Sequence, residues 1–274
     1  MKKILLVLLL LIAKIGYSQD LFDYENSKKF AEYLVKSGQI ESAAKEYERL
    51  VFMQPTKDSL KLSLVGLYRQ SGNYEAALRR SQQFFPDLTT MPLPHTYEYS
   101  KILLQKKDYK TANNFWNQSQ TLKSEDKIIL SSMADIFQEK FKNANKKLAP
   151  LDTANMPLVR DLKDIMGAAS HEKYKSPFAA GAFSAIVPGA GRFYTKDWKD
   201  ALFSIVFTGA MAYQSYKGFN KTGINSTRGW IYGGVAFGFY LGNIYGSVAS
   251  AKKFNSKKKQ KYINDVEVLF NSKY

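Results

Sequence analysis

A pattern with a period of about 34 residues, a length typical of stacked helical hairpins, runs through positions 24–150 and restricts the fold more than any other sequence feature. Gly38 and Gly72 lie one period apart, and so do Ala43 and Ala77. Each hairpin of such a stack buries its apolar face only against its neighbours. The pattern continues at nearly the same spacing, first with Tyr109, Ala112 and Trp116 and then with Phe141 and Ala144.

The residue types within one period predict how each hairpin folds. Glycine at positions 38 and 72 marks the reversal of the chain, because glycine adopts positive φ without strain. A small residue a few positions later lets the second helix approach the first closely, and larger residues at helical spacing then fill the space between units. The small residues expected at these contacts are Ala43, Ala77, Ala112 and Ala144.

The strings SGQIESAAKEYERL, SGNYEAALRR, KKDYKTANNFW and EKFKNANKKL resemble units of the tetratricopeptide repeat (TPR) family. The resemblance implies an α-solenoid whose concave groove binds a peptide or protein partner. A spacer without a partner is the alternative. The prolines of Met91–Pro94 predict a rigid connector between the second and third units, and His95 after it is expected to be solvated or to cap a helix. The aromatic residues expected in the core rather than in a ligand platform are Tyr97, Tyr99, Phe115 and Trp116.

The N-terminal segment has the layout of a secretory signal peptide. Lys2 and Lys3 precede the apolar run 4–13, and small residues at 16 and 18 follow. We expect cleavage after Ser18 and export of the mature chain. An uncleaved anchor is the alternative, which the run disfavours because it is too short to span a bilayer of about 30 Å.

Three uncharged runs, 177–191, 201–216 and 229–251, follow an abrupt change of composition after Lys175. At 1.5 Å per residue the third run reaches about 34 Å, enough to cross a bilayer. The second is shorter, and Pro188 argues against a straight spanning helix in the first. We therefore expect the second and third runs to cross the membrane as a hairpin, with Tyr and Trp residues in belts at both interfaces. A buried hairpin in a soluble protein is the alternative.

A row of glycines at every fourth position lies in the third run. Four glycines on one face are costly in a soluble helix, at roughly 1 kcal/mol each against alanine. In lipid the same row lets two helices pack closely, and the second run offers small residues for it. The glycines expected to pack against the second run are Gly234, Gly238, Gly242 and Gly246.

The string SAIVPGAGRFYTKDWKDALFS, residues 184–204, resembles the S-x-x-x-P-G-x-G-x-x-Y segment of small bacterial membrane-hairpin domains. The resemblance extends over the three uncharged runs and implies membrane insertion, with little indication of an activity. Arg192 departs from the pattern, because it replaces the usual polar residue after the second glycine. The loop residues that carry the resemblance are Pro188, Gly189, Gly191 and Tyr194.

Composition excludes several kinds of site. The chain of 274 residues has no cysteine and only two histidines, which leaves almost no material for a metal site or a histidine-based catalytic triad. Asp and Glu form no constellation with His, Ser or Lys, so we expect no catalytic residues, no metal and no cofactor. The formal charge is +16, and residues 252–274 carry seven lysines against two acids. Because the chain carries an export signal, this tail predicts contact with anionic lipid rather than with nucleic acid.

Together these patterns predict an all-α protein, a TPR-like α-solenoid followed by a hydrophobic helical hairpin. The expected function is that of a membrane-tethered adaptor or scaffold of the bacterial cell envelope, with the repeats on the periplasmic side holding a protein or peptide partner. The alternative is an accessory subunit of an envelope assembly or transport machine, in which the hairpin is the working part. The predicted segments are a signal peptide (1–18), helical repeats (19–150), a helical linker (151–175), a membrane-associating helical module (176–251) and a basic tail (252–274).

Overall fold

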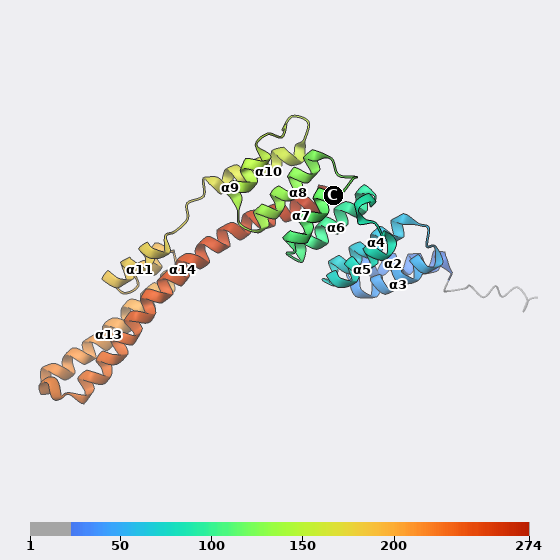
Figure 1. The fold of residues 1–274 in the computed structure, drawn as a ribbon. Coiled ribbons are helices and arrows are strands. Elements are labelled where there is room, and N and C mark those ends of the chain that lie inside the picture. The colour runs from blue at the N-terminus through green and yellow to red at the C-terminus, as the bar shows by residue number, and fades with distance from the viewer. Residues whose placement is uncertain (1–22, 274) are drawn as a thin grey trace, which may run out of the picture. The chain divides into compact units, whose positions relative to one another are not determined.

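A computed structural model describes residues 23–273 of the chain. Every regular element in this range is a helix, which confirms the prediction of an all-α fold for these residues (Figure 1). The predicted signal peptide lies outside the described residues. The chain divides into two compact units, the first ending at Ala134 and the second comprising Asp135–Lys273. The sequence placed the end of the repeats at residue 150, whereas this division falls earlier, inside a helix.

The first unit consists of antiparallel helical hairpins in chain order. Each second helix packs against the first helix of its own pair, and α3 and α4 join consecutive pairs. The elements are α2 (Tyr24–Lys36), α3 (Ile40–Met53), α4 (Asp58–Gln70), α5 (Tyr74–Phe84), the short 3-10 helix η1 (Leu88–Thr90), α6 (Leu93–Gln105), α7 (Tyr109–Gln118) and α8 (Ser124–Phe137), which runs across the division.

The same turn recurs between helices at the predicted period. Gly38, Gly72, Lys107 and Glu139 all have positive φ, between 61° and 77°. In each turn this residue donates its N–H to the carbonyl three residues back, and the next residue donates to the carbonyl five residues back. This arrangement satisfies the last carbonyls of the preceding helix. The repeated geometry therefore extends to two turns that contain no glycine.

The core of the first unit is built from the small residues of the period and the larger apolar residues around them. Ala43, Ala77 and Ala112 are completely buried. Trp116 is also buried, at 1% exposure, and its indole N–H donates to Ser100 Oγ at 2.9 Å. The indole is thus buried without leaving its N–H unpaired, and the hydrogen bond fixes the orientation of the ring in this core. Other aromatic and aliphatic side chains buried here are Tyr99, Phe115, Leu50, Leu64 and Ile102.

His95 lies inside the first unit, and the expectation of a solvated or capping histidine is wrong. The residue is 5% exposed, within α6, and its ring lies 4.6 Å from that of Phe85. Oδ2 of Asp58 lies 3.6 Å from Nε2 of His95. The sequence did not indicate this burial because the prolines before His95 begin α6 instead of holding it in an exposed turn.

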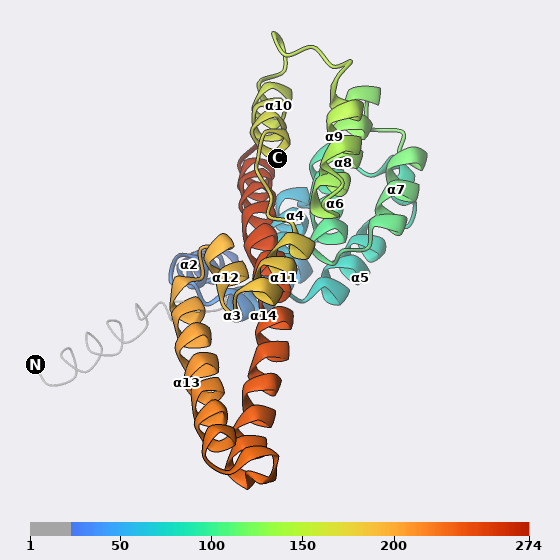
Figure 2. The same ribbon diagram turned by 90° about the vertical axis from the view of Figure 1, so that its left-hand side faces the viewer.

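In the second unit, most of the helices pack along one long helix. Figure 2 shows α14 beside α13, with α11 along the same helix. In the C-terminal part of its length α14 packs against α10. The elements are α9 (Phe141–Leu148), α10 (Pro157–Ser170), α11 (Pro177–Ile186), α12 (Ala190–Tyr194), α13 (Trp198–Thr222), the short η2 (Gly223–Asn225) and α14 (Thr227–Lys273).

The lysine-rich segment predicted as a tail is the continuation of α14. Tyr262, Val266 and Phe270 lie on one face of this helix and are buried. Tyr262 donates its hydroxyl to Glu172 Oε2 at 2.8 Å, and Lys258 pairs with the other oxygen of the same carboxylate. The predicted boundary at 251 thus falls within a helix of 47 residues, because the apolar residues of the segment recur at spacings of four.

The predicted membrane crossings are not found. Within residues 23–273, no helix combines the length and the apolar character that crossing a membrane requires. Residues 201–216 and 229–251 are nevertheless helical and lie side by side in α13 and α14.

Candidate functional site

The second unit exposes many large apolar side chains between residues 174 and 245. Phe178, for example, is 85% exposed on α11, and Val206 and Phe237 are exposed on α13 and α14. Extended apolar surface of this kind marks a site of contact with a membrane or a protein. We call α11–α14 up to residue 251 the apolar module. Further exposed members are Phe183, Ile186, Val187, Phe193, Leu202, Ile205, Ile224, Ile231 and Leu241.

Aromatic residues with nearby cations lie at the beginning of α13, in its C-terminal half and at the beginning of α14. Trp198, Tyr213 and Trp230 are exposed. Lys199 Nζ lies 5.7 Å from the ring centroid of Trp198, and Lys217 Nζ lies 5.5 Å from that of Tyr213. Amphipathic rings beside cations are suited to the boundary between an apolar phase and water.

The S-x-x-x-P-G-x-G-x-x-Y segment joins α11 to α12 by close backbone contact. Ser184 is completely buried; its Oγ accepts the Gly191 N–H at 2.9 Å and lies 2.7 Å from Ser247 Oγ on α14. A Cβ at Gly191 would collide with the carbonyl oxygen of Ala180. The serine and the second glycine therefore hold α12 against α11 and α14.

The other residues of this segment have positioning roles as well. Gly189 follows Pro188 and has φ +89°, and a Cβ there would lie 2.6 Å from the Ala201 carbonyl oxygen on α13. Tyr194 accepts the Ser176 N–H on its hydroxyl at 3.2 Å, and Lys175 Nζ lies 4.4 Å from its ring centroid. The loop residues selected from the sequence are thus brought together, and each contact found for them is structural.

The glycine row of α14 does not form the predicted packing face. A Cβ at Gly234, Gly238 or Gly242 would meet no atom within 4 Å, so α13 does not approach these three positions closely. Gly246 does lie in close contact, but its neighbour is the guanidinium of Arg192 on α12.

Close contact between α13 and α14 occurs near their connection instead. A Cβ at Gly218 would lie 2.6 Å from the backbone nitrogen of Gly229, and one at Gly233 would lie 2.9 Å from Ser215 Oγ. Ser215 Oγ also donates to the Gly229 carbonyl at 2.8 Å. The glycine row continues beyond this contact, where the two helices leave space between them.

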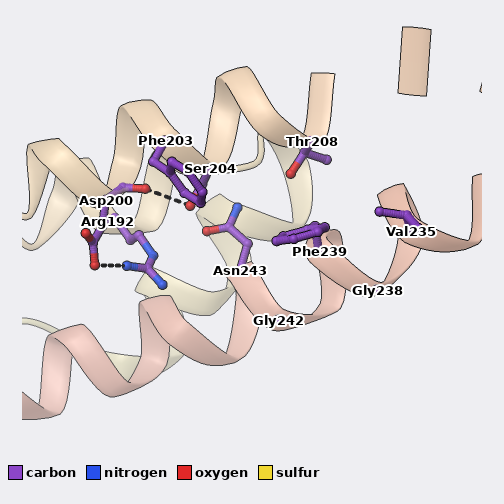
Figure 3. A pocket seen from close by; sticks show the side chains of 10 residues that line it. All are labelled: Arg192, Asp200, Phe203, Ser204, Thr208, Val235, Gly238, Phe239, Gly242 and Asn243. Carbon is purple, nitrogen blue, oxygen red and sulfur yellow. Dashed lines mark hydrogen bonds and ion pairs between the residues drawn. The ribbon is translucent and has the colours of Figure 1, made fainter. Parts of the chain in front are cut away.

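A pocket occupies that space between α13 and α14 (Figure 3). Gly238 and Gly242 form part of its wall, and polar side chains project into it beside aromatic rings. Arg192 lies at one end, where its Nη1 donates to Asp200 Oδ2 at 2.5 Å. The lining residues are Arg192, Asp200, Phe203, Ser204, Thr208, Val235, Gly238, Phe239, Gly242 and Asn243.

Most of the polar groups of this pocket carry little signal in the sequence. Asn243 is the one side-chain amide in residues 229–251, and a lone amide in an apolar run was the available signal. Arg192 stood out only as a departure from the loop pattern. Thr208 carried no signal of its own, because it belonged to the small residues interpreted as a packing face.

The first unit exposes a separate apolar surface on its first hairpin. Phe30 and Tyr33 on α2 and Phe52 on α3 are exposed.

A charged network connects the first two helical hairpins of this unit. Tyr68 donates its hydroxyl to Glu48 Oε1 at 2.7 Å, and Arg80 pairs with the same carboxylate. Burial, and then the bond to Glu48, raise the pKa of Tyr68 to about 12.

Within the described range, residues 23–273, no three His, Cys, Asp or Glu side chains are grouped so that they hold a metal ion. The chain was also compared with known proteins. Models of protein families, curated proteins and solved structures each gave no match to the chain.

Proposed function

We propose that the protein is a membrane-tethered adaptor of the bacterial cell envelope. The TPR-like helical hairpins of the first unit hold a protein or peptide partner, and the apolar module lies against a lipid bilayer. The observation that carries the proposal is the concentration of exposed large apolar side chains in residues 174–245. A surface of this extent is unfavourable in water, at about 25 cal/mol for each Å² left exposed.

Lipid is the proposed occupant of this surface because of the residues around it. Exposed Trp198, Trp230 and Tyr213 are of the types enriched where a bilayer meets water. Lysines beside the rings add attraction to anionic head groups, at about 1 kcal/mol for each cation near the surface. The segment that resembles bacterial membrane-hairpin domains belongs to the same module, where it connects α11 through α12 to α13.

A partner for the first unit is proposed from its architecture. Helical hairpins that repeat with one turn geometry expose equivalent positions at regular intervals, which suits recognition of an extended partner. The exposed Phe30, Tyr33 and Phe52 supply apolar anchors of the kind enriched in protein interfaces.

Vesicle flotation tests the lipid proposal on the full chain. The parent is expected to float with vesicles of phosphatidylethanolamine that contain a minority of phosphatidylglycerol. The variant Phe178→Ser/Val206→Ser/Phe237→Ser removes apolar side chains from three helices of the module. Each loss is worth about 1.5–3 kcal/mol of burial, at least a tenfold fall in partitioning per residue.

The control variant is Phe30→Ser/Phe52→Ser/Val268→Ser, which removes three exposed apolar side chains outside the module. It is expected to float like the parent, and circular dichroism of both variants checks that the helices are intact. Flotation of the module variant at the level of the parent would overturn the lipid proposal.

A further inference from the structure

The pocket between α13 and α14 contains buried polar groups without a hydrogen-bond partner in the protein. Asn243 is 4% exposed, and neither Oδ1 nor Nδ2 of its amide has a partner. Thr208 is 8% exposed on the facing helix, and its hydroxyl is also unpartnered. Buried polar groups are nearly always paired, so each of these two requires an explanation. In Figure 3 the Asn243 amide projects from α14 toward α13.

At one end of the pocket, the charge of Arg192 is paired through Nη1, whereas its buried Nε has no hydrogen-bond partner in the protein. Arg192 Nη1 lies 2.5 Å from Asp200 Oδ2 and 3.9 Å from Asp197 Oδ2. One guanidinium thus faces two carboxylates, and this end of the pocket carries no excess of positive charge. A neutral head group therefore suits the pocket better than a carboxylate or a phosphate, which the two aspartates would repel.

The remainder of the wall is apolar and open. Phe203, Phe239 and Val235 line it, and the ring of Phe239 lies 4.5 Å from that of Phe207. Gly238 and Gly242 contribute bare backbone, with no atom within 4 Å of a Cβ built at either position. The pocket has a volume of about 690 Å³, which is within the range of sites for small organic ligands.

We propose that this pocket binds a neutral amphiphile whose head group both donates and accepts hydrogen bonds, such as a primary acyl amide. The amide of the ligand pairs with the Asn243 amide through two complementary hydrogen bonds, and Thr208 supplies a further hydroxyl. The hydrocarbon chain lies along Gly238 and Gly242 against the phenylalanine rings. In this assignment the glycine row forms the floor of a binding site.

The proposal goes beyond the adaptor function and does not depend on it. Binding is measured with radiolabelled oleamide on the purified full chain in mild detergent, and detergent alone gives the background. Methyl oleate has the same chain without a hydrogen-bond donor, and oleate has an anionic head. We expect saturable binding of oleamide at one site per chain, with at least tenfold weaker binding of both competitors.

Two variants change the pocket and one serves as a matched control. Asn243→Leu removes the amide and is expected to weaken oleamide binding at least tenfold. Gly242→Leu fills the floor and is expected to abolish binding. Gly234→Leu makes the same change at a glycine that also faces open space but lies outside the pocket lining, so it is expected to bind like the parent. Circular dichroism and thermal melting of each variant check the fold.

Several results would overturn the assignment. They are the absence of saturable oleamide binding to the parent, equal binding of oleamide and methyl oleate, and unchanged binding by a folded Asn243→Leu variant. Vesicle flotation of the same variants is measured separately. A chain that floats without binding oleamide contradicts this inference alone, and a chain that binds oleamide without floating contradicts the lipid proposal alone.

Discussion

At the scale of single residues, His95 links the stability of the first unit to pH. Burial lowers the pKa of His95, and Lys61 lowers it further, whereas the nearby carboxylates of Asp58 and Glu98 raise it. Burial is the largest of these effects, so the folded state favours the neutral ring. The unfolded chain binds a proton near the ordinary pKa of about 6.5, and protonation therefore favours unfolding.

The free energy of unfolding of the first unit is expected to have its full His95 contribution above a pH of about 6.5. This contribution is lost as the pH falls through the lower pKa of the folded state. Urea unfolding followed by tryptophan fluorescence measures it, because Trp116 is buried in this unit while Trp198 and Trp230 are exposed. His95→Gln should reduce the slope between about pH 7 and pH 5, and His171→Gln, an exposed histidine of the second unit, is the control substitution. An equal slope in parent and His95→Gln would contradict this explanation.

At the scale of elements, substitution by glycine is expected to have opposite effects in the turn before α7 and within α7 itself. Lys107 has φ +62°, a conformation that costs a residue with a side chain roughly 1–2 kcal/mol. Lys107→Gly should therefore stabilise the first unit by about 0.5–1 kcal/mol, after the entropy that glycine loses on folding.

Lys110→Gly is the matched control for this turn. Lys110 lies in the first turn of α7 and is exposed, where glycine costs up to about 1 kcal/mol in a helix. Urea unfolding monitored by Trp116 compares both variants with the parent. If Lys107→Gly is as destabilising as Lys110→Gly, the positive φ at this turn is not a source of strain.

The C-terminal part of α14 is a second element whose contribution is measurable. Phe270 is buried and Val268, two residues earlier, is exposed. Phe270→Ala should cost about 3–5 kcal/mol, because the substitution removes a buried aromatic side chain and leaves a cavity. Val268→Ala should change stability by no more than about 0.5 kcal/mol.

Hydrogen exchange of the amides in α14 and α10 provides the measurement. A loss of about 3 kcal/mol corresponds to roughly a hundredfold faster exchange where opening is global. Equal protection in Phe270→Ala and Val268→Ala would show that the lysine-rich segment is only loosely attached, as the sequence interpretation of a basic tail assumed.

At the scale of the whole molecule, the sequence predicts the fold best where one local rule decides the structure. Gly38 and Gly72 mark turns because positive φ favours glycine, and the buried alanines follow at a constant interval. The turns at Lys107 and Glu139 were harder to detect, since their hydrogen bonds are the same but their residues carry no glycine signal. The third and fourth units therefore match the sequence pattern less completely than the first two, because lysine and glutamate stand at the turn positions that Gly38 and Gly72 occupy.

The candidate site was less predictable, because it depends on distances between helices rather than on the pattern along one helix. The glycine row at 234, 238 and 242 was identified, but its spacing does not reveal whether a neighbouring helix approaches it or leaves a pocket. The runs interpreted as membrane crossings were chosen for lack of charge. Within residues 23–273, no helix is both long enough and apolar enough for that role.

The continuity of α14 means that adding or removing a residue within it changes how its two parts face their neighbours. The residues that line the pocket and those that pack against α10 belong to one helix of 47 residues, about 70 Å long. An in-frame insertion of a single codon between Asn243 and Tyr262 would turn one set relative to the other by about 100°. Point substitutions on the exposed side of this segment preserve the angle. Insertions and deletions of one codon do not preserve it. We therefore expect this segment of the helix to tolerate substitutions far better than the gain or loss of a residue.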